Sequence, residues 1–100
     1  MNDKELRLLT KSIDFYGKYT QNQSKVLCLL VENSIDDLVY MSVVNISKKT
    51  GVTRATVYST LNVLQIDGMI KKGGNCKGMF KIVREKINFM IKHYNQNYYN

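Results

Sequence analysis

The chain has 100 residues, 44% of them hydrophobic, and a formal net charge of +7, which suits one small basic domain with its own core. No apolar run approaches the ~20 residues of a membrane span, and the N-terminus lacks the apolar block of a secretory signal. Cys28 and Cys76 form no CxxC pair or Cys/His cluster, so we expect no metal or other cofactor. These features predict a reduced, cytoplasmic protein without a membrane partner.

The first part of the chain predicts two helices and a short strand. Residues 4–16 carry apolar side chains at helical spacing, and the polar stretch 18–23 interrupts the pattern after Gly17. Residues 24–33 are apolar nearly all round, which predicts a short helix at the centre of the core. An Asp36-Asp37 turn and the segment LVYM then predict a short strand within residues 35–41.

Residues 42–67 predict two helices joined by a sharp turn. Ser42 is a suitable N-cap for a helix that ends at Thr50 and Gly51, and glycine supplies the backbone geometry that the turn requires. Thr53 is a suitable N-cap for the next helix, residues 54–67. The core stripe of that helix follows helical spacing and comprises Val57, Leu61 and Leu64.

The rest of the chain predicts a hairpin and a last helix. Gly68 ends the preceding helix, and two short apolar segments within residues 69–83 flank the loop KKGGNCKG. Residues 84–98 form an amphipathic pattern whose apolar side comprises Ile87, Met90, Ile91, Tyr94 and Tyr98.

The positive charge is concentrated in one part of the sequence. Residues 48–86 carry nine Lys and Arg against two Asp and Glu, whereas residues 1–47 carry five against six. A basic excess confined to the turn and hairpin region is typical of a surface that binds a polyanion.

Residues 42–83 resemble the winged helix-turn-helix superfamily of DNA-binding proteins. The resemblance implies one domain over residues 1–100, mainly α with a small β-wing, with additional N- and C-terminal helices. Its helix-turn-helix covers about 42–67, its wing about 69–83 and its C-terminal helix about 84–98. The matching positions are a turn glycine, a helix cap, core residues, a second glycine and an aliphatic residue: Gly51, Val52, Thr53, Thr56, Val57, Leu61, Leu64, Gly68 and Ile70.

The size and layout also resemble the TubR-like proteins, which are centromere-binding adaptors of tubulin-type partition systems. That resemblance implies a homodimer that binds double-stranded DNA, represses its own operon and works with a tubulin-like GTPase. A simple transcriptional repressor is the first alternative. A winged helix used only for protein-protein assembly is the second.

The N-terminal part of helix 54–67 is the segment that would enter the major groove. The guanidinium of Arg54 can pair with a guanine edge or a phosphate, and the hairpin lysines can follow the backbone. The alternative is a solvated surface without a partner. The predicted DNA-binding residues are Lys48, Lys49, Thr53, Arg54, Ala55, Thr56, Tyr58, Ser59, Lys71, Lys72 and Lys77.

Val63 and Ile66 lie outside the core stripe of the same helix. They either pack on a neighbouring segment of the chain or are covered by a second subunit. The last helix offers another apolar surface. The predicted dimer-interface residues are therefore Val63, Ile66, Ile87, Met90, Ile91 and Tyr94.

Catalytic chemistry is not expected from this sequence. His93 is the single histidine and has no carboxylate near it in sequence, and no phosphate-loop, nucleophile-elbow or zinc motif occurs. We therefore expect a DNA-binding protein that is not an enzyme.

Overall fold

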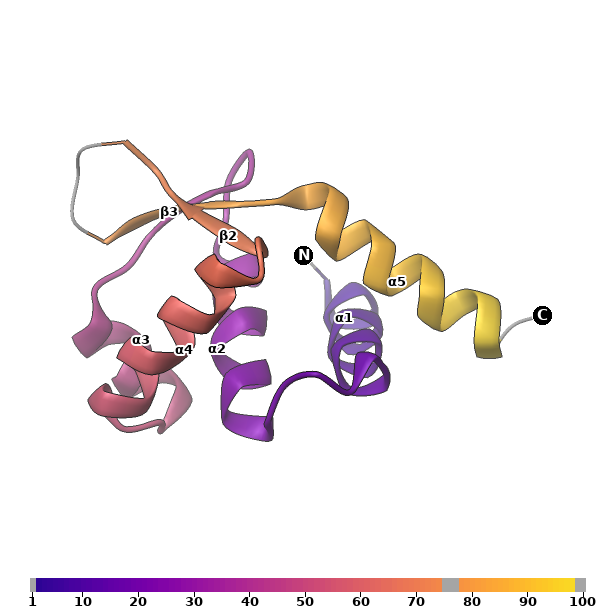
Figure 1. Cartoon of the computed structure of the whole chain (residues 1–100), viewed down its shortest axis with the longest axis horizontal. Coiled ribbons are helices and arrows are strands. Elements are labelled where there is room, and N and C mark those ends of the chain that lie inside the picture. The colour runs from indigo at the N-terminus through magenta and orange to yellow at the C-terminus, as the bar shows by residue number, and fades with distance from the viewer. Residues whose placement is uncertain (1, 75–77, 99–100) are drawn as a thin grey trace.

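The computed structural model describes residues 2–74 and 78–98, which form five helices and a small antiparallel sheet (Figure 1). The predicted fold class, mainly helical with a small sheet, is confirmed at this level. Within these residues, no helix has both the length and the apolar character to cross a membrane. In chain order the elements are α1 (Asp3–Tyr16), α2 (Gln21–Glu32), β1 (Leu38–Tyr40), α3 (Val43–Thr50), α4 (Arg54–Ile66), β2 (Ile70–Lys72), β3 (Met79–Ile82) and α5 (Arg84–Tyr98).

Helix α2 occupies the centre of the helical layer. It contacts α1 on one side and both α3 and α4 on the other, while α5 packs on α1 at the far end of the molecule (Figure 1). Val26, Leu27 and Leu30 of α2 are fully buried, as the apolar pattern of this helix predicts. The core therefore runs through the whole molecule from α4 to α5.

Helix α2 begins three residues before the predicted start. The side chain of Thr20 accepts a hydrogen bond from the backbone N–H of Gln23, and the Gln23 side chain accepts one from the backbone N–H of Thr20. This reciprocal capping box satisfies two backbone donors, so residues 21–23 of the polar stretch join α2, whereas residues 18–20 separate the two helices as predicted.

The sheet has three strands in the order β1-β3-β2, with both neighbouring pairs antiparallel. The sequence predicts the β2–β3 hairpin and the β1 strand, but it does not predict that β1 pairs with β3. The side chains of Val39, Phe80, Ile70 and Ile82 are buried and share one face, which packs toward the helices.

A tight turn and an ion pair fix the position of β1. Asp36 and Asp37 have φ angles of 53° and 67°, and Ile35 and Leu38 exchange two backbone hydrogen bonds across them. Arg84, the first residue of α5, holds the Asp37 carboxylate through Nε and Nη2 at 2.8 and 2.7 Å. This contact ties the predicted Asp-Asp turn to the start of the last helix.

Candidate functional site

The connection between α3 and α4 is three residues long and well hydrogen-bonded. Ser42 caps α3 by accepting from the Asn45 N–H, and Gly51 ends it with φ 74° while its N–H donates to the carbonyl of Ser47. A Cβ on Gly51 would meet nothing within 4 Å, so glycine is required there by the backbone angle alone. Both predictions, the Ser42 cap and the Gly51 turn, are confirmed.

Side-chain hydroxyls hold the rest of this connection. The Ser47 hydroxyl donates to the carbonyl of Val52 at 2.6 Å, and the Thr50 hydroxyl donates to the carbonyl of Ile46 at 2.7 Å. The Val52 N–H donates to the Thr50 hydroxyl oxygen at 3.2 Å, and the Val52 side chain is buried. The turn therefore fixes the direction of α4 relative to α3.

The N-terminus of α4 carries positive charge without compensation. Thr53 caps the helix by accepting from the Thr56 N–H at 3.3 Å, as predicted. Arg54 is the first helical residue, and the first turn, all of it within the described residues, contains no acidic side chain. A cation at the positive end of a helix dipole is unfavourable by a few tenths of a kcal/mol up to about 1 kcal/mol. An anion placed there would relieve this repulsion.

Nine of the eleven predicted DNA-binding residues are exposed. The exception among the described residues is Thr56, which is half-buried and accepts a hydrogen bond from Thr53. Lys77 lies outside the described residues. The exposed residues are Lys48, Lys49, Thr53, Arg54, Ala55, Tyr58, Ser59, Lys71 and Lys72.

Two of these lysines already have a local function. Lys48 and Lys49 stand in the last turn of α3, where cations stabilise the negative end of the helix dipole. They also lie just before the turn that leads to Arg54. The same side chains can therefore stabilise α3 and place charge next to α4.

The two lysines of β2 point to opposite faces of the sheet. Lys72 pairs in register with Phe80, whose side chain is buried, so Lys72 lies on the face that packs toward the helices. Lys71 pairs with Lys81 on the outer face. The sequence prediction treated Lys71 and Lys72 as one group, but strand alternation separates them.

Asp67 is the only carboxylate between residues 42 and 83, and its charge is engaged. One oxygen accepts a 2.8 Å hydrogen bond from the Tyr19 hydroxyl, and the other lies 3.4 Å from the Lys18 ammonium. Burial, together with the Asp67 contact, raises the pKa of Tyr19 well above its usual value. The sequence alone does not reveal this link, because Lys18 and Tyr19 are far from Asp67 in the chain.

The predicted dimer-interface residues fall into two groups. The Ile66 side chain is 75% exposed and Val63 is half-buried, so the α4 patch is accessible. In contrast, Ile87, Met90 and Tyr94 are buried in the core of a single chain, where α5 packs on α1. Of the predicted interface residues on α5, only the half-buried Ile91 is therefore left for a dimer contact. Dimerisation stays a prediction.

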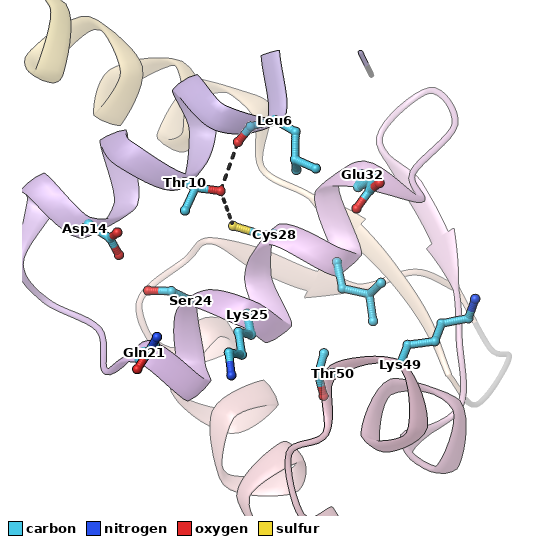
Figure 2. A pocket seen from close by; sticks show the side chains of 11 residues that line it. Leu6, Thr10, Asp14, Gln21, Ser24, Lys25, Cys28, Glu32, Lys49 and Thr50 are labelled. Atoms are coloured by element: carbon cyan, nitrogen blue, oxygen red, sulfur yellow. Dashed lines mark hydrogen bonds between the residues drawn. The ribbon is translucent and has the colours of Figure 1, made fainter. Parts of the chain in front are cut away.

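A groove of about 480 Å³ lies between α1, α2 and the end of α3 (Figure 2). The Thr10 hydroxyl donates to the Leu6 carbonyl at 2.9 Å and lies 3.7 Å from the Cys28 sulfur. Burial raises the pKa of the Cys28 thiol, and the Thr10 contact offsets this only in part, so the thiol stays protonated near neutral pH. The rim carries both charge signs and so favours no single ligand charge: Asp14, Glu32, Lys25 and Lys49.

No group of His, Cys, Asp or Glu in the described part of the chain is arranged to hold a metal ion. No protein-family model, curated protein or solved structure matches this chain.

Proposed function

We propose that this protein binds double-stranded DNA as a winged helix-turn-helix, with α3 and α4 as the helix-turn-helix and the β2–β3 hairpin as the wing. The observation that carries the proposal is the N-terminal turn of α4, which is exposed, free of acidic side chains and headed by Arg54. Three residues join it to α3, and hydrogen bonds from the Gly51 N–H and at both backbone groups of Val52 hold this surface in one orientation.

The chemistry of the surface fits a duplex. The exposed Ala55 allows the α4 backbone to approach base edges closely in the major groove, and the hydroxyls of the exposed Tyr58 and Ser59 can donate to bases or phosphates. Lys48 and Lys49 extend the charge from α3, and Lys72 adds charge from the helix-facing side of the hairpin. Phosphate contacts of this kind supply affinity, and Arg54 is the residue best placed to supply specificity.

The exposed Ile66 favours a homodimer. A large aliphatic side chain that is 75% exposed at the end of α4 gains free energy when a second copy covers it, at about 25 cal/mol per Å² of apolar surface. A dimer would present two copies of α4 to one DNA site. Such a protein acts by occupying DNA or by recruiting another protein, which suits a repressor or a partition adaptor.

The proposal is tested by titrating labelled duplexes at several salt concentrations. A dimer with about three to five phosphate contacts per subunit should give a slope of log affinity against log salt of roughly −5 to −9. Affinity should then fall by about 10³- to 10⁵-fold between 50 and 200 mM salt. Absence of binding to every duplex at low salt would refute the proposal and favour protein-protein assembly.

Arg54→Ala separates specific from non-specific binding. If Arg54 contacts a base edge, the variant should lose about 1–3 kcal/mol on the preferred site and much less on random DNA. Arg7→Ala is the matched control, because Arg7 is an exposed arginine on α1 and its loss changes the net charge equally. Equal losses on both DNAs for Arg54→Ala would reduce Arg54 to a phosphate contact.

A further inference from the structure

In the described part of the chain, no helix covers the outer face of the sheet, where Leu38, Tyr40, Lys71 and Lys81 are exposed. The proposed duplex contact does not use this face. Strand alternation and register place five side chains on it, opposite to the buried face of Val39 and Phe80. These five residues, named here the outer sheet face, are Leu38, Tyr40, Lys71, Met79 and Lys81.

Two like charges stand directly opposite each other on the outer sheet face. Lys71 and Lys81 are register partners in the β2–β3 pair, and both are exposed. Like charges at directly opposed positions destabilise a sheet. The three strands, all within the described residues, contain no acidic side chain that could offset this repulsion. An anionic partner lying across both lysines would remove it.

The same face carries exposed apolar and aromatic surface beside the lysines. Tyr40 is 69% exposed and Leu38 is 44% exposed. Between β1 and β3, backbone hydrogen bonds join Met41 to Gly78 and Ile82 to Asp37. Hydrogen-bonded and non-hydrogen-bonded pairs alternate along an antiparallel pair of strands. The pairs Leu38–Lys81 and Tyr40–Met79 are therefore of the non-hydrogen-bonded kind. Side chains approach most closely in pairs of this kind. The aromatic ring and the two ammonium groups therefore belong to one continuous surface.

We propose that the outer sheet face binds single-stranded nucleic acid, with Tyr40 stacking on a base and Lys71 and Lys81 contacting the backbone. Single strands are bound by this combination of a cationic track with an exposed ring, because every base has a face that can stack. A second copy of the chain is a poor occupant, since it would bring four lysines together. An acidic peptide would use the lysines but not the ring.

This site is separate from the proposed duplex contact, so the two can fail independently. Arg54 and Lys72 serve the duplex contact, whereas Tyr40, Lys71 and Lys81 serve the outer sheet face. Lys71 and Lys72 are adjacent in sequence, equally charged and on opposite faces, which makes each the matched control for the other.

The test is anisotropy of a fluorescein-labelled oligo(dT) of about 15 nucleotides, near the upper site size of one small binding domain. Tyr40→Ala and the double variant Lys71→Ala with Lys81→Ala should each weaken binding by at least about fivefold. Tyr40→Phe should retain affinity because it keeps the ring. Lys72→Ala should bind oligo(dT) like the native protein and bind duplex more weakly, while Arg54→Ala should affect only the duplex.

Two results would overturn the inference. The first is that the native protein does not bind oligo(dT), or that Tyr40→Ala binds it as tightly as the native protein does. The second is displacement of oligo(dT) by polyglutamate at equal charge concentration, which would assign the surface to acidic peptides. Circular dichroism of each variant checks the fold. Tyr40→Leu provides a second ring-free variant that keeps an apolar side chain opposite Met79.

Discussion

The α1–α5 pair and the α3–α4 pair each bury an apolar stripe, but their exposed sides differ in charge. The first turn of α1 contains Asp3 and Glu5, and exposed basic residues follow within the same helix. The exposed side of α3 and α4 has Lys48, Lys49 and Arg54 and no carboxylate. Asp67, at the end of α4, is already engaged by Lys18 and Tyr19.

This contrast separates packing from recognition. Apolar periodicity describes the stripe that each pair buries, and it does so equally well at both ends of the molecule. A surface that carries both charge signs exerts little net force on an approaching ion. On a surface of a single sign, the charged side chains repel one another and attract a partner of opposite charge. The basic end is therefore the end at which a polyanionic partner changes the energy most.

The largest expected effect distinguishes the two apolar patches. Met90 is 1% exposed between α5 and α1, so Met90→Glu buries a carboxylate without a partner. That costs several kcal/mol, a large part of the total of about 5–15 kcal/mol that stabilises a domain. Thermal melting by circular dichroism should show an unfolded or strongly destabilised chain. Ile66→Glu, on the exposed patch, should cost the fold of a single chain only about 0.5 kcal/mol, apart from any stability that a dimer adds. Similar melting of the two variants would contradict the packing of α5 on α1.

The next effect concerns assembly. If α4 lies in the dimer interface, Ile66→Glu and Val63→Glu should give folded monomers that bind DNA much more weakly, because a charge would be buried at a self-complementary contact. Ile91→Glu should leave the dimer intact. Sedimentation or light scattering measures the difference. A dimer that survives Ile66→Glu and is lost in Ile91→Glu would assign the interface to α5.

Local sequence signals predicted most of the fold. The caps at Ser42 and Thr53 and the turn at Gly51 depend on residues close in the chain, so they could be read directly. The missed start of α2 was also local, because the Thr20–Gln23 capping box was present in the sequence. In contrast, the pairing of β1 with β3 and the Tyr19–Asp67 bond join distant residues that no short pattern connects.

The candidate site was predicted less completely. The helical spacing of apolar residues in α4 identifies its buried stripe, and Arg54 and its neighbours lie outside that stripe, so their exposure could be predicted. Periodicity could not tell a core stripe from an interface stripe in α5, because both are apolar and have the same spacing. The separation of Lys71 from Lys72 was readable from strand alternation, but only once the strand bounds and the partner Phe80 were known.

A smaller effect is expected from alanine substitutions at two glycines, Gly51 at the end of α3 and Gly17 at the end of α1. Gly51 and Gly17 have φ angles of 74° and 73°, and an added Cβ makes no close contact at either position. Alanine at each should therefore cost about 1–2 kcal/mol of stability through backbone strain alone. Because Gly51 sets the direction of α4, Gly51→Ala should also weaken duplex binding, whereas Gly17→Ala should not. Equal DNA affinities for the two variants, measured well below their melting temperatures, would mean that the turn does not orient the site.

The smallest expected effect tests the Tyr19–Asp67 bond, which links the α1–α2 connection to the end of α4. Tyr19→Phe should cost about 1 kcal/mol near neutral pH, the usual net value of one hydrogen bond.

Because folding raises the pKa of Tyr19, the folded state holds the phenol proton more tightly than the unfolded chain. The stability from this bond is therefore fully present below pH ~10, the unfolded tyrosine value, and is lost as pH rises above it. Thermal melting of the native protein and of Tyr19→Phe at several pH values around 10 gives the contribution of Tyr19, because the other titrating groups are the same in both proteins. The difference between them should be constant below about pH 9 and shrink above pH 10, and a constant difference throughout would show that the hydroxyl does not contribute in this way.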